Sequence, residues 1–137
     1  MILNDVVCKD SQHGYCKANI KINKDTIEAI DIISTDPSKF SESSFYVTKG
    51  FVNSHLHPNQ LFDRRLLDEL NISELLHKMH HDYQKNDEER YTQALFVLME
   101  AIKSGSTTVY AVASHPVPVL KAFKTLGIKG AVSCFFN

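Results

Sequence analysis

Residues 50–58 read Gly-Phe-Val-Asn-Ser-His-Leu-His-Pro, and this stretch decides how the rest of the chain is interpreted. Residues 50–55 are expected to form a strand, with His55 and His57 at its C-terminal end. Side chains at i and i+2 point to the same face of a strand, so the two imidazoles can reach one metal ion from one side. The spacing alone does not separate zinc from iron, nickel or copper, and a structural role for both histidines is the alternative.

The residues that follow alternate between strand and helix patterns. This alternation predicts an α/β fold with a parallel sheet built from βαβ units. Helices are expected from Asn71, from Asp87 to Gly105 and from Pro116 to Gly127, and further strands at residues 107–112 and 128–136. The second helix is expected to bury one stripe and the third another, and the last strand, almost wholly apolar, is expected to be covered on both faces. The two stripes are Tyr91, Ala94, Leu95, Leu98, Ala101 and Ile102, and Val119, Leu120, Phe123 and Leu126.

Residues 1–48 have a different pattern. Apolar residues cluster at Val6 and Val7 and alternate with period two through residues 18–22 and 26–32, which predicts a small antiparallel sheet. Residues 23–25 are expected to form a hairpin turn between the last two runs, and the serine-rich residues 34–44 a polar connection. We therefore expect a β-rich leader at 1–48 and a separate α/β region at 49–137.

Composition excludes several classes of protein. The formal net charge is -1, so no basic stripe is available for a nucleic acid. The start of the chain has neither the basic nor the apolar region of a secretory signal, and no apolar run approaches the roughly 20 residues that cross a bilayer. A cytoplasmic location without membrane contact is the expectation. Three cysteines without a Cys-x-x-Cys pair, Cys8, Cys16 and Cys134, are expected to be reduced and mostly packed.

Three parts of the chain carry a resemblance to a known family. Residues 50–57 resemble the first-strand signature of the amidohydrolase superfamily, and most closely its branch of nucleobase and aminohydrolase deaminases and triazine chlorohydrolases. Residues 100–108, Glu-Ala-Ile-Lys-Ser-Gly-Ser-Thr-Thr, resemble the helix of that branch that runs into a Gly-Thr-Thr second strand. Residues 1–48 resemble its small sandwich domain. Lys49 stands where the family usually has proline, a departure that concerns the turn more than the chemistry.

The resemblance implies a fold and half of a site. The fold is the N-terminal part, about three strands, of a (β/α)8 TIM-type barrel, preceded by a small β-rich segment of a β-sandwich domain. His55 and His57 match the paired first-strand metal ligands, and the cofactor is a divalent metal, zinc first with iron as the alternative. A complete barrel needs about 250 residues. The family's other ligands and acid-base groups lie on later strands, beyond the 137 residues, so the catalytic residues stay unknown.

Three more residues are candidates for contact with substrate. Asn59 and Gln60 follow the histidine pair, and their amides could hydrogen-bond a heterocycle, with loop solvation as the alternative. His115, after the second barrel strand, is expected at the same rim, or else as a helix N-terminal or surface histidine. His77 and His81 form an i, i+4 pair, but Lys78 stands where a His-Glu-x-x-His protease needs glutamate, which favours ordinary surface or packed histidines.

Three functions remain open from the sequence. The first is the N-terminal part of a metal-dependent amidohydrolase that hydrolyses C–N bonds, of the deaminase or cyclic amidase type, through metal-activated water. Its substrate would be a small heterocycle or cyclic amide. The second is a non-catalytic truncated fragment. The third is one subunit of a split barrel enzyme completed by a second chain, and self-association is also open because an unpaired strand edge invites it.

Overall fold

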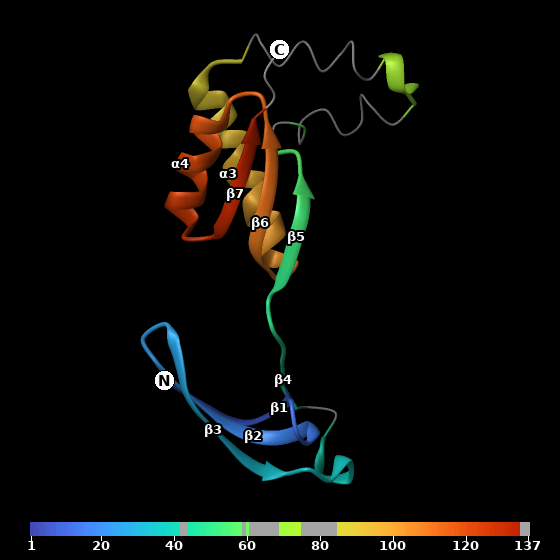
Figure 1. Cartoon of the computed structure of the whole chain (residues 1–137), viewed down its shortest axis with the longest axis vertical. Coiled ribbons are helices and arrows are strands. Elements are labelled where there is room, and N and C mark those ends of the chain that lie inside the picture. The colour runs from blue at the N-terminus through green and yellow to red at the C-terminus, as the bar shows by residue number, and fades with distance from the viewer. Residues whose placement is uncertain (42–43, 59, 61–68, 75–84, 135–137) are drawn as a thin grey trace. The chain divides into compact units, whose positions relative to one another are not determined.

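The structure, a computed structural model, divides into two compact units. It describes residues 1–41, 44–58, 60, 69–74 and 85–134. The first unit is Met1–Lys49 and the second Gly50–Asn137, and each is considered by itself (Figure 1). In the described part of the chain, no helix is long and apolar enough to cross a membrane.

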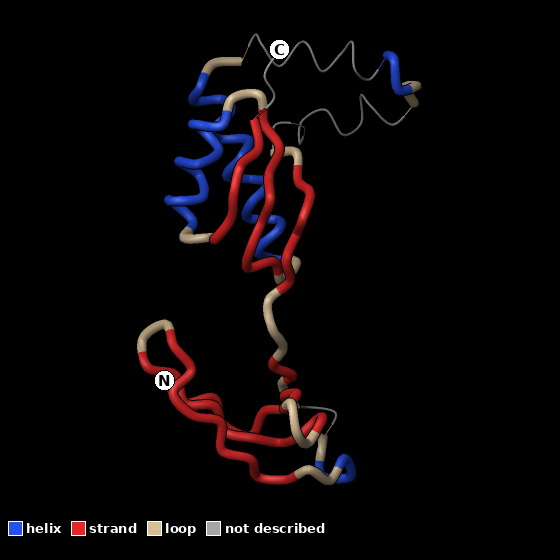
Figure 2. The backbone as a smooth tube through the Cα atoms, viewed as in Figure 1, coloured by secondary structure: helices blue, strands red, loops and turns tan. Residues whose placement is uncertain are grey.

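The first unit is a four-stranded sheet with strand order β3-β2-β1-β4 (Figure 2). Three long strands form an antiparallel meander, and the short β4 pairs in parallel with β1. The expected runs at 18–22 and 26–32 lie within β2 and β3, and the expected turn joins them at Lys24 and Asp25. The elements are β1 (Ile2–Asp10), β2 (Gly14–Asn23), β3 (Thr26–Ser34), the 3-10 helix η1 (Pro37–Lys39) and β4 (Tyr46–Val47).

The turn between β1 and β2 is built around one carboxylate. Asp10 Oδ1 accepts hydrogen bonds from the backbone N–H groups of Gln12, at 2.8 Å, and His13, at 3.0 Å, and lies 2.8 Å from His13 Nδ1. These bonds, that from Gln12 first, lower the pKa of Asp10 to about 2. This turn, which was not predicted from the sequence, brings β1 and β2 together over a buried cluster: Val6, Cys8, Cys16, Ala18 and Ile20.

The second unit is a three-stranded parallel sheet, β5-β6-β7, with two helices (Figure 1). The expected parallel βαβ arrangement is confirmed. The helices α3 and α4 share one core with β6, to which alternate residues Val109, Ala111 and Ala113 contribute, so both helices cover the same face of that strand. The elements are β5 (Phe51–Leu56), α3 (Asp87–Lys103), β6 (Ser106–Ala113), α4 (Pro116–Leu126) and β7 (Lys129–Cys134).

The helix ends follow the local sequence. Asn86 caps α3 in a capping box with Glu89, and Gly105 follows the helix with a φ of 88°. Pro116 occupies the first turn of α4, and Gly127 ends it in the left-handed conformation. The helix start expected at Asn71 carries a capping box, since Asn71 Oδ1 accepts from the N–H of Glu74 at 3.1 Å and Glu74 Oε2 accepts from the N–H of Asn71 at 3.0 Å. The rest of that expected helix, residues 75–84, lies outside the described residues.

Three expectations about burial were wrong. Ile102 and Leu120 are 40% and 50% exposed, because each lies about 100° around its helix from the buried positions Ala101 and Val119. In β7, Lys129, Gly130 and Ala131 are exposed and the next three residues are partly buried. Among the described residues β7 pairs only with β6 and helices cover only one face of the sheet, so β7 is not enclosed.

Candidate functional site

The histidine pair lies where β5 ends. His55 is on the strand, which ends at Leu56, and His57 follows it. Their Nε2 atoms are 2.9 Å apart, and their rings meet edge to face with centroids 4.7 Å apart. The i, i+2 spacing thus brings the two imidazole nitrogens next to each other, as expected for side chains on the same face of a strand.

The backbone on either side holds the pair in place. The N–H of His55 donates to Asn53 Oδ1 at 3.1 Å, and Leu56 pairs with Ala111 on β6 across a register shift in the β5-β6 ladder. Pro58 is fully buried immediately after the second histidine. The peptide carrying His57 is therefore fixed by a strand pairing before it and a buried ring after it.

The two rings differ in exposure and charge. His55 is exposed and His57 is half-buried. The pKa of His57 is lowered from 6.5, first by burial, which disfavours the imidazolium, and then by repulsion from His55. The 2.9 Å approach also requires that at least one Nε2 presents a lone pair. The neutral state that this favours is the one in which imidazole binds metals.

The distance between the nitrogens tests whether one ion could lie between them. Zinc lies about 2.0–2.1 Å from a histidine nitrogen, so two nitrogens on one tetrahedral ion are roughly 3.3–3.4 Å apart. The observed 2.9 Å between the Nε2 atoms is a hydrogen-bond distance and is shorter than that by about 0.4 Å, so the two rings need to separate only slightly to share an ion. Among the described residues, no group of three or more His, Cys, Asp and Glu side chains is close enough to hold a metal. His55 and His57 are therefore suited to be two of the ligands of a metal site.

Two of the three expected substrate-side residues are described. Gln60 is half-buried, and its N–H donates to the carbonyl oxygen of His57 at 3.4 Å. His115 follows β6 at the N-cap of α4, and its Nδ1 lies 3.2 Å from Ser114 Oγ. Because β5 and β6 are parallel neighbours, His115 and the histidine pair follow the same edge of the sheet. Asn59, His77 and His81 lie outside the described residues.

Two further polar residues, one at this edge of the sheet and one on α3, were not predicted from the sequence. Cys134 ends β7, and its thiol donates to the carbonyl oxygen of Ser114 at 3.8 Å. Its place at a strand end was the signal that could have identified it. Gln93, only 5% exposed, accepts a hydrogen bond from Lys85 Nζ at 3.4 Å, and nothing in its surrounding helical pattern distinguished it.

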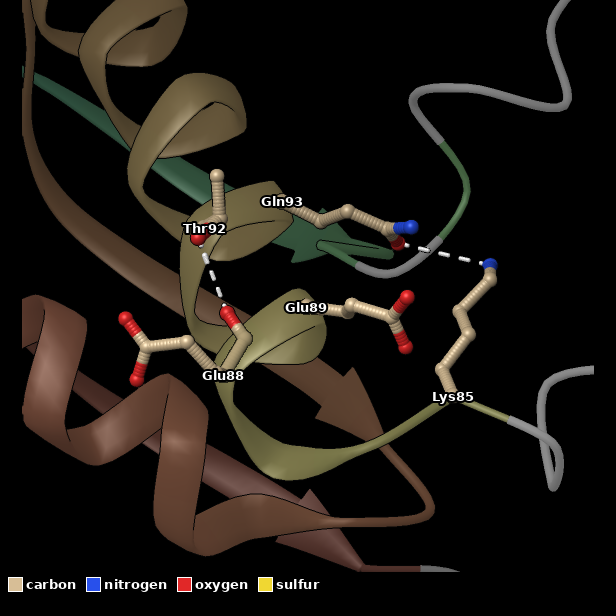
Figure 3. Close-up of a pocket in the computed structure, with 5 residues that line it drawn as sticks. All are labelled: Lys85, Glu88, Glu89, Thr92 and Gln93. Atoms are coloured by element: carbon tan, nitrogen blue, oxygen red, sulfur yellow. Dashed lines mark hydrogen bonds between the residues drawn. The ribbon is translucent and has the colours of Figure 1, made fainter.

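A pocket of about 340 Å³ lies at the start of α3 (Figure 3). Two of its polar side chains form hydrogen bonds with the backbone at the start of the helix. Glu89 accepts from the N–H of Asn86 at 2.8 Å, and Thr92 Oγ1 donates to the carbonyl oxygen of Glu88 at 2.8 Å. The histidine pair is not part of its lining, which consists of Lys85, Glu88, Glu89, Thr92 and Gln93. The pocket is therefore a feature of the helix start and separate from the histidines.

The fold and the paired histidines define a class: an α/β protein with candidate metal ligands at the carboxyl edge of a parallel sheet. No family model matches the chain. The 5-methylthioadenosine/S-adenosylhomocysteine deaminase of Thermococcus sibiricus is 26% identical over 137 residues, which cover 97% of this chain and 32% of that protein. The chain thus spans about a third of the length of this curated relative.

Solved structures share the fold. The zinc complex of atrazine chlorohydrolase from Arthrobacter aurescens matches with a TM-score of 0.71 at 19% identity, over 97% of this chain and 35% of that one. Guanine deaminase of E. coli matches with a TM-score of 0.59 at 14% identity, over 88% of this chain and 30% of that one. Together with the curated relative, these proteins point to the amidohydrolase superfamily and match only its N-terminal part.

Proposed function

We propose that this chain forms the N-terminal part of a metal-dependent amidohydrolase that hydrolyses a C–N bond, of the deaminase or cyclic amidase type. In this proposal β5, β6 and β7 are the first three strands of a (β/α)8 barrel. Residues 1–48 are a segment of a β-sandwich domain, and residues 49–137 are the barrel part. The observation that carries the proposal is the 2.9 Å approach of His55 Nε2 and His57 Nε2 at the carboxyl end of a parallel strand, where barrel enzymes place their active sites.

The two imidazoles would hold a divalent metal, with zinc first and iron as the alternative. Such an ion supplies Lewis acidity and lowers the pKa of a water molecule toward neutrality. Catalytic zinc sites usually have three protein ligands. Since the described residues offer two, at least one further ligand must come from outside them.

The chain's own residues would hold and orient the reacting groups. His55 and His57 bind in their neutral forms, which the lowered pKa of His57 favours. The amides of Asn59 and Gln60 would hydrogen-bond a ring nitrogen or carbonyl of the substrate, and His115 would contact it from the end of β6. Each of these groups would orient the substrate. Correct orientation of the substrate is the contribution that positioning residues make to the reaction rate.

The substrate that we propose is a small nitrogen heterocycle or a cyclic amide. The relatives are named for action on 5-methylthioadenosine and S-adenosylhomocysteine, guanine, and atrazine. All four molecules contain an electron-poor aromatic ring with nitrogen atoms. A hydroxide nucleophile attacks such a ring carbon, and the amine or halide on that carbon leaves.

Hydrolysis by the isolated chain tests the proposal. The chain, with Zn²⁺ or Fe²⁺ added, is incubated with aminated purines, cyclic amides and chlorinated triazines, and released ammonium, ring-opened product or chloride is measured. Because at least one further metal ligand must come from outside the described residues, we expect turnover only where the rest of the site is supplied, and we expect it to depend on the metal and to be lost when His55 and His57 are both alanine. Turnover that survives either chelation or this double substitution would contradict the metal mechanism.

Absence of turnover under all of these conditions would favour the alternatives, a non-catalytic chain or one subunit of a split barrel. One observation favours the split barrel: among the described residues β5 and β7 each pair on one side only. Another polypeptide, or a second copy of this chain, could pair with these edges.

Metal affinity should depend on pH. Both imidazoles must be neutral to bind, so protons compete with the metal at low pH. Because the pKa of His57 lies below 6.5, that residue stays neutral at neutral pH and protonates only on the acid side of 6.5. We expect zinc affinity to be nearly constant above about pH 7 and to fall progressively as the pH drops further below 6.5. Competition with a zinc-sensitive dye of known pH dependence measures this, and an affinity that is flat over the whole range would argue against imidazole ligands.

A further inference from the structure

Two thiols in the first unit lie directly opposite each other. Cys8 on β1 and Cys16 on β2 are partners in the antiparallel ladder, and their Sγ atoms are 3.8 Å apart. Cys8 is 7% exposed and Cys16 is fully buried. The pairing from Val6 and Ala18 to Asp10 and Gly14 runs without a register shift, so the two cysteines are held in register on both sides.

The backbone geometry suits a covalent bond between them. The N–H of Val7 donates to the carbonyl oxygen of Phe45, next to β4, at 2.8 Å. Backbone groups alternate in direction along a strand, so those of Cys8 face β2, and the cysteines form a hydrogen-bonded pair with Cα atoms about 5.5 Å apart. Disulfides span Cα separations of about 4.4–6.8 Å. Opposed residues of an antiparallel pair also point to the same face, so a change in side-chain torsion can close the remaining gap between the sulfurs.

We propose that Cys8 and Cys16 are a redox modification site that small-molecule disulfides oxidise to an intramolecular disulfide. The thiolate of one cysteine attacks a sulfur of the small disulfide, forms a mixed disulfide and releases one small thiolate. The thiolate of the second cysteine attacks the protein sulfur of that mixed disulfide and releases the other. The two protein protons end on the two released small thiols, the two protein sulfurs are oxidised, and the small disulfide is reduced.

Cys8 is the residue that reacts first. It is the less buried of the two, and it lies two residues from Asp10, where the ladder ends at the exposed turn. Opening of this end of the hairpin exposes both paired cysteines before the middle of the sheet, and the less buried Cys8 is reached first. A hydrogen-bonded position suits the disulfide torsion less well than a non-hydrogen-bonded one, so the resulting disulfide is strained. Strained disulfides are more easily reduced, and the oxidation is therefore reversible.

Oxidation should become faster as the pH rises. The pKa of Cys8 is raised, first by burial and then by its hydrogen bond with Cys16 and the charges of Cys16 and Asp10. The side chain that packs from β4, Val47, is apolar and adds no charge. Since only the thiolate attacks a disulfide, the reaction is slow at neutral pH and accelerates above it.

The experiment uses the full chain with Cys134→Ser, so that only the pair can react. It is incubated with oxidised glutathione without denaturant, then analysed by thiol titration, intact mass and peptide mapping. We expect both thiols to be lost together, a mass lower by two hydrogen atoms, a Cys8-Cys16 linked peptide, and full reversal by dithiothreitol. The oxidised chain should also unfold at a higher temperature than the reduced one, because the cross-link restricts the unfolded hairpin.

Cys16→Ala in the same background is the matched control, and it should take up one glutathione at Cys8 and form no internal link. Three results would overturn the proposal: both thiols remain reduced, two glutathiones attach to one chain, or the cysteines link one chain to another. These outcomes are read on the Cys134→Ser chain itself, so they remain decisive if the control variant does not fold.

Discussion

Replacing His55 and His57 together with alanine is expected to lower the affinity of the chain for Zn²⁺ by at least about 100-fold, because the pair supplies both of the ligands that we propose for the ion. The single variants should each lose most of this affinity, since one imidazole alone cannot replace the two adjacent ligands that the pair supplies. Equilibrium dialysis of the metal-free proteins, with the bound zinc measured by elemental analysis, provides the readout.

Two histidines elsewhere are matched controls for this loss. His13 lies in the exposed turn of the first unit beside Asp10, and His115 follows β6. Alanine at His13 should leave zinc binding unchanged, and alanine at His115 should do so too if that residue contacts substrate rather than metal. Equal losses at His13 and at the pair would mean that the binding is not specific to the end of β5. Wild-type affinity in the double variant would remove the metal site altogether.

The order of the elements and the position of the pair could be predicted because both depend on local sequence. Period-two and helical patterns identify strands and helices, and Gly105 and Gly127 mark helix ends because glycine readily adopts the left-handed conformation there. The approach of His55 and His57 follows from their spacing on a strand, since residues two apart share a face. These features need no knowledge of what packs against them.

Features that depend on distant partners could not be predicted. Helical periodicity indicates a buried face but not its width, so Ile102 was expected in the core, whereas Arg90 and Gln93, each 5% exposed, occupy the buried face instead. The opposition of Cys8 and Cys16 depends on the register of β1 and β2, which the turn after Asp10 sets. Register is a property of the pairing and cannot be read from either strand by itself.

Replacing Gly130 with alanine is expected to destabilise the second unit by about 3 kcal/mol or more. Gly130 pairs with Val109 on β6, and a Cβ at this position would collide with the carbonyl oxygen of Val109 and lie 3.1 Å from Phe123 Cε2. Val109 is fully buried between the strands and helices, so its backbone cannot move away without disrupting the shared core. The added methyl must therefore push β7 away from β6. Urea unfolding followed by hydrogen exchange at the amides of β6 and β7 measures the loss in this unit.

Lys129→Ala is the control, because Lys129 is the exposed neighbour of Gly130 on the same strand and should change stability by less than about 0.5 kcal/mol. The amides of β1 and β2, in the other compact unit, should keep their protection in both variants. The substitution also links the fold to the site, because β6 is the strand that fixes Leu56 between the two histidines. If β6 and β7 separate in the Gly130→Ala chain, zinc affinity should fall although no ligand has changed, whereas unchanged affinity in a destabilised sheet would mean that β5 holds the pair without its neighbour.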